Sequence, residues 1–129
     1  LESGLWELLQ RAATGNLADV SRESVRFGPA AVCVVMASEG YPRDFTAGFP
    51  IEGLDEARAL NDVYLFHAGT RLEAGGWLTS GGRVLGVTAR AETLEAARAR
   101  AYRAVEMIRF KGAQYRPDIA RSAAEHECA

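Results

Sequence analysis

The sequence predicts an α+β fold in which a small antiparallel sheet carries flanking helices. The β-branched-rich run Ala30–Ala37 lies between Pro29 and a turn-forming Ser-Glu-Gly segment, which is typical of a strand. Three further strand patterns follow within residues 63–89, and their connections are too short for parallel crossovers. A long amphipathic pattern over residues 93–108 then predicts a helix that packs on the sheet.

Length and composition limit the classes of protein that this sequence can represent. Its 129 residues suffice for one domain with a short extension, and 48% hydrophobic residues exclude wholesale disorder. A net charge of -2 makes nucleic acids and anionic membranes poor partners. The two cysteines, Cys33 and Cys128, are too few for a disulfide scaffold or a zinc site. We therefore expect a cytoplasmic location, and no targeting or membrane-spanning segment is visible in the sequence.

The N-terminal part contains one amphipathic pattern and one connection. Apolar residues at helical spacing predict a helix over residues 3–14, and Gly15-Asn16 ends it. Residues 17–29 mix charges with Ser, Gly and Pro, so we expect a connection there, with a short strand allowed at 25–27. This connection is the only internal boundary that the sequence suggests.

The central part of the chain predicts the sheet. We expect residues 30–37 to form its central strand, buried on both faces because the run is continuously apolar. A short helix over residues 54–60 should follow Gly53. Strands at 63–68, at 71–78 with an interruption at Gly75-Gly76, and at 83–89 should then form an antiparallel meander.

The last long element is the helix at 93–108. Thr93 is suited to cap its N-terminus, with Glu95 in the first turn. Its apolar residues share one face, which should lie on the sheet: Leu94, Ala97, Ala101, Ala104, Val105 and Ile108.

Motifs of nucleotide, dinucleotide and metal-helix sites are absent from the sequence. His67 and His126 are not spaced to share a metal. His67 ends a strand pattern, where a side chain can line a cleft. The residues alone favour a hydrogen-bonded structural histidine over a role in a site.

The segment Thr79-Ser80-Gly81-Gly82-Arg83 joins two strand patterns and has two interpretations. The first is a hairpin tip, because Gly-Gly accepts the positive φ angles of tight turns. The second is an anion cradle, in which the glycine amides and the Thr79 or Ser80 hydroxyl face phosphate oxygens and Arg83 supplies the charge. The residues alone favour the hairpin.

Five motifs together resemble the phosphoribosylamine–glycine ligase family, whose members are also called glycinamide ribonucleotide synthetases. They are Gly40-Tyr41-Pro42, Ile51–Ala57, Phe66–Thr70, Gly81–Ala89 and Tyr115–Ile119. The resemblance covers residue 1 to about residue 123, and only the C-terminal part of the enzyme. Two positions depart from the family pattern: Ser80 stands where Asn is typical, and Ala120 where Gly is usual.

The resemblance implies a domain organisation and a fold. Residues 1–27 would be a helix and linker leaving a missing ATP-grasp domain, 28–122 the ligase C-terminal domain and 123–129 a flexible tail. The sheet would be of the rudimentary hybrid-motif type found in the C-terminal module of biotin carboxylase. The implied partners are the N-terminal and ATP-grasp domains of the same enzyme. These would hold ATP and Mg or Mn, with no cofactor or metal in this chain.

The family reaction joins glycine to 5-phosphoribosylamine in de novo purine biosynthesis and converts ATP to ADP and phosphate. By resemblance, Arg83 would bind the substrate phosphate with the amides of Gly81 and Gly82, and His67 would shape the cleft wall. Thr79 and Ser80 are the further substrate-binding candidates. We expect no catalytic residue in this chain, and no activity from it alone. The alternatives are a stand-alone phosphoribosyl-binding or assembly module without catalysis, and a purely structural domain.

Overall fold

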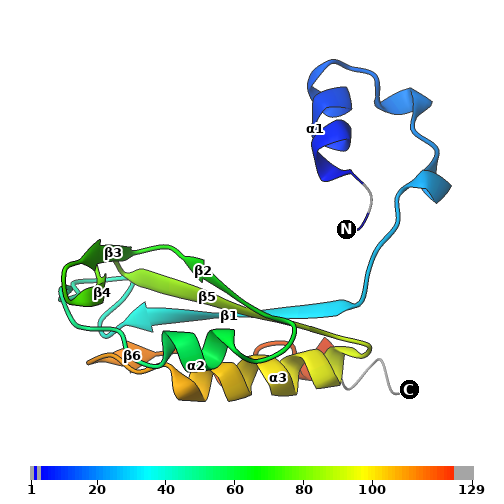
Figure 1. Ribbon diagram of the computed structural model, residues 1–129. Coiled ribbons are helices and arrows are strands. Elements are labelled where there is room, and N and C mark those ends of the chain that lie inside the picture. Colours follow the sequence, from blue (N-terminus) through cyan, green and yellow to red (C-terminus); the bar gives the residue numbers. More distant parts are fainter. Residues whose placement is uncertain (1, 3, 124–129) are drawn as a thin grey trace.

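A computed structural model describes residue 2 and residues 4–123. Figure 1 shows a sheet with two helices beneath it and a separate N-terminal helix above it. The elements in chain order are α1 (Leu5–Ala13), the 3₁₀ turns η1 (Leu17–Asp19) and η2 (Arg22–Ser24), β1 (Ala30–Ser38), α2 (Leu54–Arg58), β2 (Val63–His67), β3 (Thr70–Glu73), β4 (Gly76–Thr79), β5 (Arg83–Ala91), α3 (Leu94–Met107) and β6 (Ala113–Gln114).

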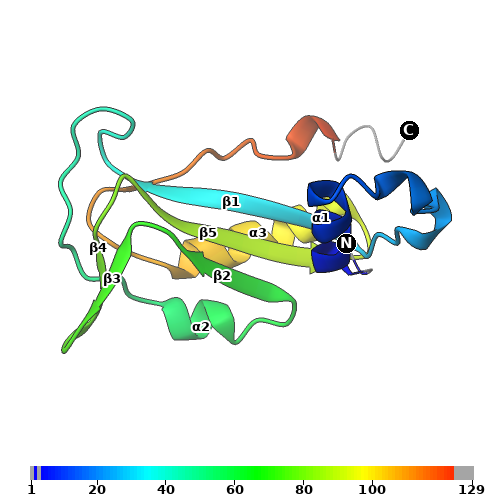
Figure 2. The same cartoon turned by 90° about the horizontal axis from the view of Figure 1, so that it is seen from above.

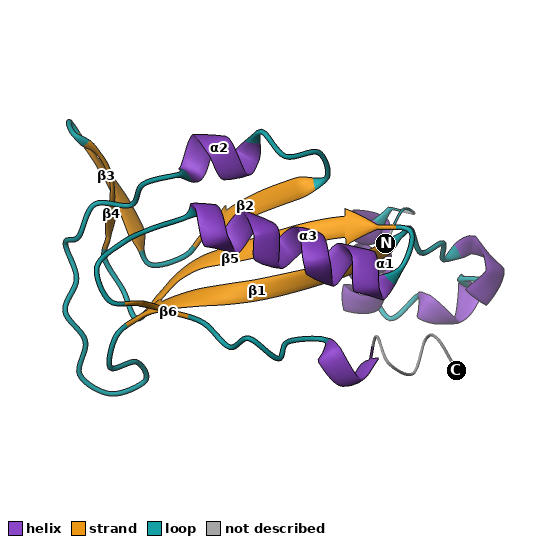
Figure 3. Cartoon of the chain, turned by 90° about the horizontal axis from the view of Figure 1, so that it is seen from below, coloured by secondary structure: helices purple, strands orange, loops and turns teal. Residues whose placement is uncertain are grey.

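The main sheet has four strands in the order β2-β5-β1-β6, and every pairing in it is antiparallel. The long β1–β5 ladder runs from Ala30 opposite Ala91 to Met36 opposite Leu85, and its register shifts after Met36. Helices α2 and α3 lie on the same face of this sheet, as Figure 3 shows from below. The expected α+β fold is therefore confirmed.

The core lies between the sheet and α3. Three alanines of this helix, Ala97, Ala101 and Ala104, are fully buried, so the helix can approach the strands closely. The Thr93 hydroxyl accepts a hydrogen bond of 3.2 Å from the Ala96 amide, and α3 begins at the next residue after this cap. The expected helix and its apolar face are both confirmed.

The expectation of one continuous meander is wrong. Strand β2 pairs directly with β5, while β3 and β4 form a separate two-stranded sheet. The Gly75-Gly76 turn closes β3 onto β4, with Thr70 opposite Thr79. Residues 80–82 consequently do not form a hairpin tip, because β4 and β5 have different partners.

Burial of β1 on both faces is also wrong. Val32, Val34 and Met36 are buried, whereas the alternating residues Ala31, Cys33 and Val35 are exposed. The reason is that α2 and α3 cover only one face of the sheet (Figure 3). The central position of β1, between β5 and β6, agrees with the expectation.

The N-terminal segment lies on the uncovered side of the sheet. Helix α1 has no buried residue, and Figures 1 and 2 show it beyond the face opposite α2 and α3. The allowed strand at 25–27 does not form, and residues 25–29 have no regular structure. Of the expected helix, residue 3 lies outside the described residues, as does most of the expected tail at 123–129.

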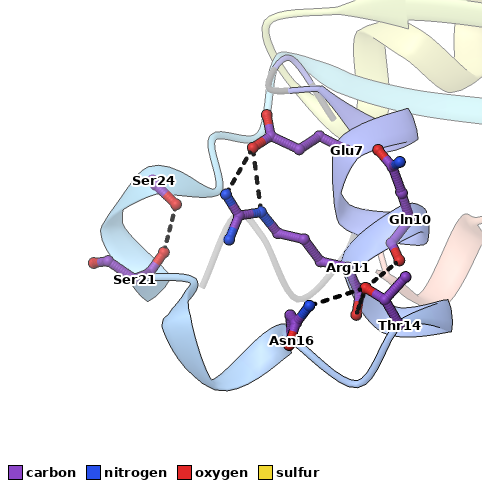
Figure 4. A network of polar contacts seen from close by, with 7 residues as sticks. All are labelled: Glu7, Gln10, Arg11, Thr14, Asn16, Ser21 and Ser24. Carbon is purple, nitrogen blue, oxygen red and sulfur yellow. Dashed lines mark hydrogen bonds and ion pairs between the residues drawn. The ribbon is translucent and has the colours of Figure 1, made fainter.

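Polar contacts stabilise α1 and, separately, the turn at residues 21–24, as Figure 4 shows. Glu7 accepts hydrogen bonds from Arg11 at 3.1 and 3.2 Å, and the Thr14 hydroxyl donates to the Gln10 carbonyl at 3.0 Å. The Ser24 hydroxyl donates to the carbonyl of Ser21 at 2.6 Å. These contacts are local to residues 7–24, and the apolar residues Leu5, Trp6 and Leu9 of α1 are exposed.

Candidate functional site

The candidate site lies at the end of the sheet where β1 ends and β5 begins, close to β3 and β4 (Figures 1 and 2). Thr79 anchors this end from within. Its side chain is fully buried, and its hydroxyl accepts a hydrogen bond of 3.0 Å from the Phe49 amide. The Thr79 amide in turn donates to the Phe49 carbonyl at 2.8 Å. Thr79 therefore fixes the strand that leads into the glycine segment.

Ser38, the last residue of β1, holds the glycine segment in place. Its hydroxyl donates to the Gly81 carbonyl at 3.0 Å, and its amide donates to the Gly82 carbonyl at 2.8 Å. Gly82 is buried, and a Cβ atom there would collide with the Tyr41 ring and lie 3.2 Å from Phe45. Neither Gly81 nor Gly82 has a positive φ, so these glycines serve close packing rather than turn geometry.

Three groups of this segment are left with unused hydrogen-bonding capacity. The amides of Gly81 and Gly82 donate to no acceptor within residues 4–123. Arg83 is exposed, and in the same range its guanidinium makes no ion pair or hydrogen bond. Ser80 is also exposed, while its amide donates to the Gly69 carbonyl at 2.8 Å. An unpaired arginine beside unpaired amides can bind an anion such as a phosphate.

His67 is held by three neighbours. Its Nδ1 lies 3.0 Å from the Thr70 hydroxyl and its Nε2 lies 3.5 Å from Nη2 of Arg58. Its ring stacks on that of Trp77 with centroids 4.0 Å apart and planes tilted by 30°. Burial lowers the pKa of His67, and the positive charge of Arg58 lowers it further. The neutral imidazole is therefore favoured near neutral pH.

The backbone connects His67 to the glycine segment. His67 is paired with Leu85 in the β2–β5 ladder, and two residues later the Gly69 amide donates to the Arg83 carbonyl at 2.8 Å. The structure thus brings His67 and the 79–83 segment to one end of the sheet. The side chain of Thr79 points into the core, whereas those of Ser80 and Arg83 are solvent-exposed.

The loop at 40–49 contributes residues that sequence reasoning did not assign to the site. Its Tyr41 and Phe45 rings cover Gly82, and Gln114 donates to the Ser38 and Tyr41 carbonyls at 2.9 and 3.3 Å. A hollow of about 200 Å³ lies beside this loop, lined by Glu39, Thr46, Phe49, Lys111 and Gly112. The Gly40-Tyr41-Pro42 motif was the available signal for the loop, but nothing in the sequence indicates that its rings pack on Gly82.

Two other kinds of site are not found in the part of the chain that the structure describes. No three His, Cys, Asp or Glu residues are grouped there so as to hold a metal ion. Among the same residues, no helix is long and apolar enough to cross a membrane.

Sequence comparison shows the family to which this chain belongs. Residues 31–122 match the family described as phosphoribosylglycinamide synthetase, C domain. The chain therefore belongs to the phosphoribosylamine–glycine ligase family. It is 50% identical over 127 residues to the phosphoribosylamine–glycine ligase of Streptomyces coelicolor, covering 96% of this chain and 30% of that protein. The ligase of Rhodopirellula baltica is 44% identical over 120 residues, covering 92% and 27%.

A solved structure shows the same fold. The phosphoribosylamine–glycine ligase of Thermotoga maritima superposes with a TM-score of 0.68 at 34% identity, covering 88% of this chain and 28% of that one. The chain thus spans less than a third of the relatives it matches, and corresponds to their C-terminal part. The relatives are enzymes, and residues 31–122 of this chain match the C domain of their family.

Proposed function

We propose that this chain is the C-terminal part of an ATP-dependent ligase that joins glycine to 5-phosphoribosylamine in de novo purine biosynthesis. Its contribution is part of the phosphoribosylamine pocket. The names of the relatives and the C-domain match support the reaction. Arg83, whose guanidinium has no partner among residues 4–123, lies next to the glycine segment and supports the role in the pocket.

The proposed ligand of Arg83 is the 5-phosphate of the substrate. A guanidinium keeps its charge at all working pH values, and its planar fork can donate two parallel hydrogen bonds to phosphate oxygens. The amides of Gly81 and Gly82 supply further donors in this proposal. Ser80, exposed beside them, adds a hydroxyl.

Thr79 and His67 act in this proposal by holding the pocket in shape. Thr79 fixes the entry to the glycine segment through Phe49, and His67 forms the adjoining wall on Trp77. A neutral His67 adds no positive charge of its own to the wall, so in this proposal Arg83 and not His67 binds the phosphate.

The chemical step itself belongs to the rest of the enzyme. The glycine carboxylate takes the terminal phosphoryl group of ATP, which releases ADP, and the ribosylamine nitrogen then displaces phosphate from the acyl phosphate. ATP and a divalent metal would be bound by the part that the relatives carry in addition, and residues 1–27 would lead from that part. Positioning the amine is what this chain adds to catalysis.

Steady-state kinetics of the full-length enzyme test this proposal. Replacing Arg83 with Ala removes a charge-assisted interaction of about 1.5–3 kcal/mol, so KM for phosphoribosylamine should rise about 10- to 100-fold. KM for ATP should stay nearly constant. Arg83→Lys should be intermediate, since lysine keeps the charge without the fork. Arg103→Ala, at an exposed arginine of α3, is the matched control. Unchanged phosphoribosylamine kinetics in Arg83→Ala would overturn the proposal.

A further inference from the structure

The main sheet has one face with no cover among residues 4–123. We call it the open face and define it by the alternate residues of three strands that lie opposite α2 and α3. Its members are Ala31, Cys33 and Val35 of β1, Gly86, Thr88 and Arg90 of β5, and Tyr64 and Phe66 of β2.

The strand register arranges these residues in rows across the sheet. Val35, Gly86 and Phe66 lie side by side in one row, and Cys33, Thr88 and Tyr64 in the next. A Cβ atom at Gly86 would lie 3.3 Å from the Cys33 Sγ and 3.7 Å from the Phe66 Cβ. The Cys33 thiol therefore lies close to Gly86 of the neighbouring row, and the two rows form one continuous surface.

The exposure of the open face differs sharply from that of the covered face. Phe66 is 59% exposed and Val35 is 46% exposed, whereas Val34, next to Val35 on β1, is fully buried. Adjacent apolar side chains of this size are seldom left in water, and such a patch usually marks an interaction site.

The path of the chain indicates what covers the open face. The Glu2 carboxylate lies 3.8 Å from the guanidinium of Arg90, a residue of the open face. Figures 1 and 2 show that the segment before β1 rises on this side of the sheet and carries α1 there. Leu5, Trp6 and Leu9 of α1 are themselves 56–77% exposed. Two exposed apolar surfaces therefore lie on one side of the part of the molecule that the structure describes.

We propose that the open face is the docking surface for the preceding part of the same polypeptide. The relatives carry more than two thirds of their length outside the region that this chain matches. In a longer chain, the part before residue 1 enters beside Arg90 and lies over the open face. The apolar side of α1 then packs against this preceding part. The inference rests on the proposed function only in placing this chain within a longer ligase.

Cys33 provides a native probe of this docking, because its thiol lies on the open face and is exposed. In the full-length enzyme, its rate of alkylation by a maleimide is measured by peptide mass spectrometry. Each rate is divided by the rate of the same cysteine in urea. Arg103→Cys places the comparison thiol on the outer side of α3. We expect Cys33 to react at least about tenfold more slowly than the comparison thiol.

A second variant separates docking from any other protection. Phe66→Glu places a charge on the open face, in the row next to that of Cys33, so it should speed alkylation of Cys33 and leave the thiol at position 103 unchanged. Equal protection factors at the two positions would overturn the inference. Protection that appears only as protein concentration rises would overturn it too, because it would assign the face to a second copy. Neither result depends on Arg83, so failure here differs from failure of the proposed function.

Discussion

Gly69 and Gly81 are packed backbone to backbone: a Cβ atom added to Gly69 would lie 2.6 Å from the Cα of Gly81. The same atom would lie 2.6 Å from the carbonyl oxygen of Arg83. Two motifs that are separate in the sequence therefore meet at the candidate site. The contact fixes the start of β5, and with it the position of Arg83.

The Gly69–Gly81 contact predicts that Gly69→Ala is disruptive. The neighbouring atoms are backbone and cannot rotate away, so we expect a loss of about 1–3 kcal/mol of unfolding free energy. In the full-length enzyme, KM for phosphoribosylamine should also rise. Gly75→Ala is the control, because nothing lies within 4 Å of the added methyl group there. Thermal unfolding measures the effect, and equal melting temperatures of the two variants would refute the prediction.

The lowered pKa of His67 predicts a dependence of stability on pH. In the unfolded chain the imidazole titrates near its ordinary value of 6.5, and in the folded chain below it. The unfolded state therefore binds more protons over this range. The contribution of His67 to the free energy of unfolding is fully present above pH 6.5, and it is lost as the pH falls toward the folded-state pKa.

Denaturant unfolding at pH 7.5 and pH 5 measures this dependence. His67→Asn removes the titrating group, so it should lose less stability between these two pH values than the wild-type chain. An equal loss in both proteins would show that other groups cause the dependence.

Tyr102 ties the segment after β6 to α3. Its hydroxyl donates to the Arg116 carbonyl at 2.6 Å and accepts from the Ile119 amide at 3.0 Å. Tyr102→Phe should therefore cost about 1–2 kcal/mol, because it leaves the Ile119 amide unsatisfied. Tyr115→Phe is the matched control, since that hydroxyl makes no hydrogen bond within residues 4–123. Equal unfolding free energies of the two variants would contradict this prediction.

Ala120 occupies a backbone conformation that favours glycine, with φ at 59°. An alanine in the left-handed conformation costs roughly 1–2 kcal/mol, and Ala120→Gly removes this cost. The gain offsets the larger conformational entropy that glycine loses on folding. We expect Ala120→Gly to leave stability unchanged or to raise it by up to about 1 kcal/mol. Ala99→Gly, the same substitution within α3, should lower it by about 1 kcal/mol. If chemical denaturation gave equal losses of unfolding free energy for Ala120→Gly and Ala99→Gly, this would argue against left-handed strain at residue 120.

The elements that sequence reasoning predicted best have a strong period of their own. Helix α3 needed only its alanine-rich face and Thr93, and the strands β1, β2 and β5 were visible as apolar runs. The pairing of the strands was not visible, because the sequence pattern of one strand carries no information about which strand lies beside it. The meander was therefore wrong, and β6 is too short to show any pattern.

Two further differences, the one-sided burial of β1 and the conformation of the 79–83 segment, have the same cause: both depend on what packs around the strand. A continuous apolar run such as Ala30–Ala37 has the same sequence pattern whether its second face is covered by this chain or by another part of a longer protein. The sequence of the 79–83 segment likewise could not show that Thr79 points into the core while Arg83 is exposed. Both depend on packing around the strand, which composition and spacing do not report.

The most direct test of the central claim is a calorimetric titration of ribose 5-phosphate into the full-length enzyme. Wild type and Arg103→Ala should bind it with the same affinity. Arg83→Ala should bind it at least about tenfold more weakly, as expected from the loss of one charge-assisted contact. Equal affinity in all three proteins would show that Arg83 is not a phosphate ligand, and would contradict the assignment of this end of the sheet to the substrate pocket.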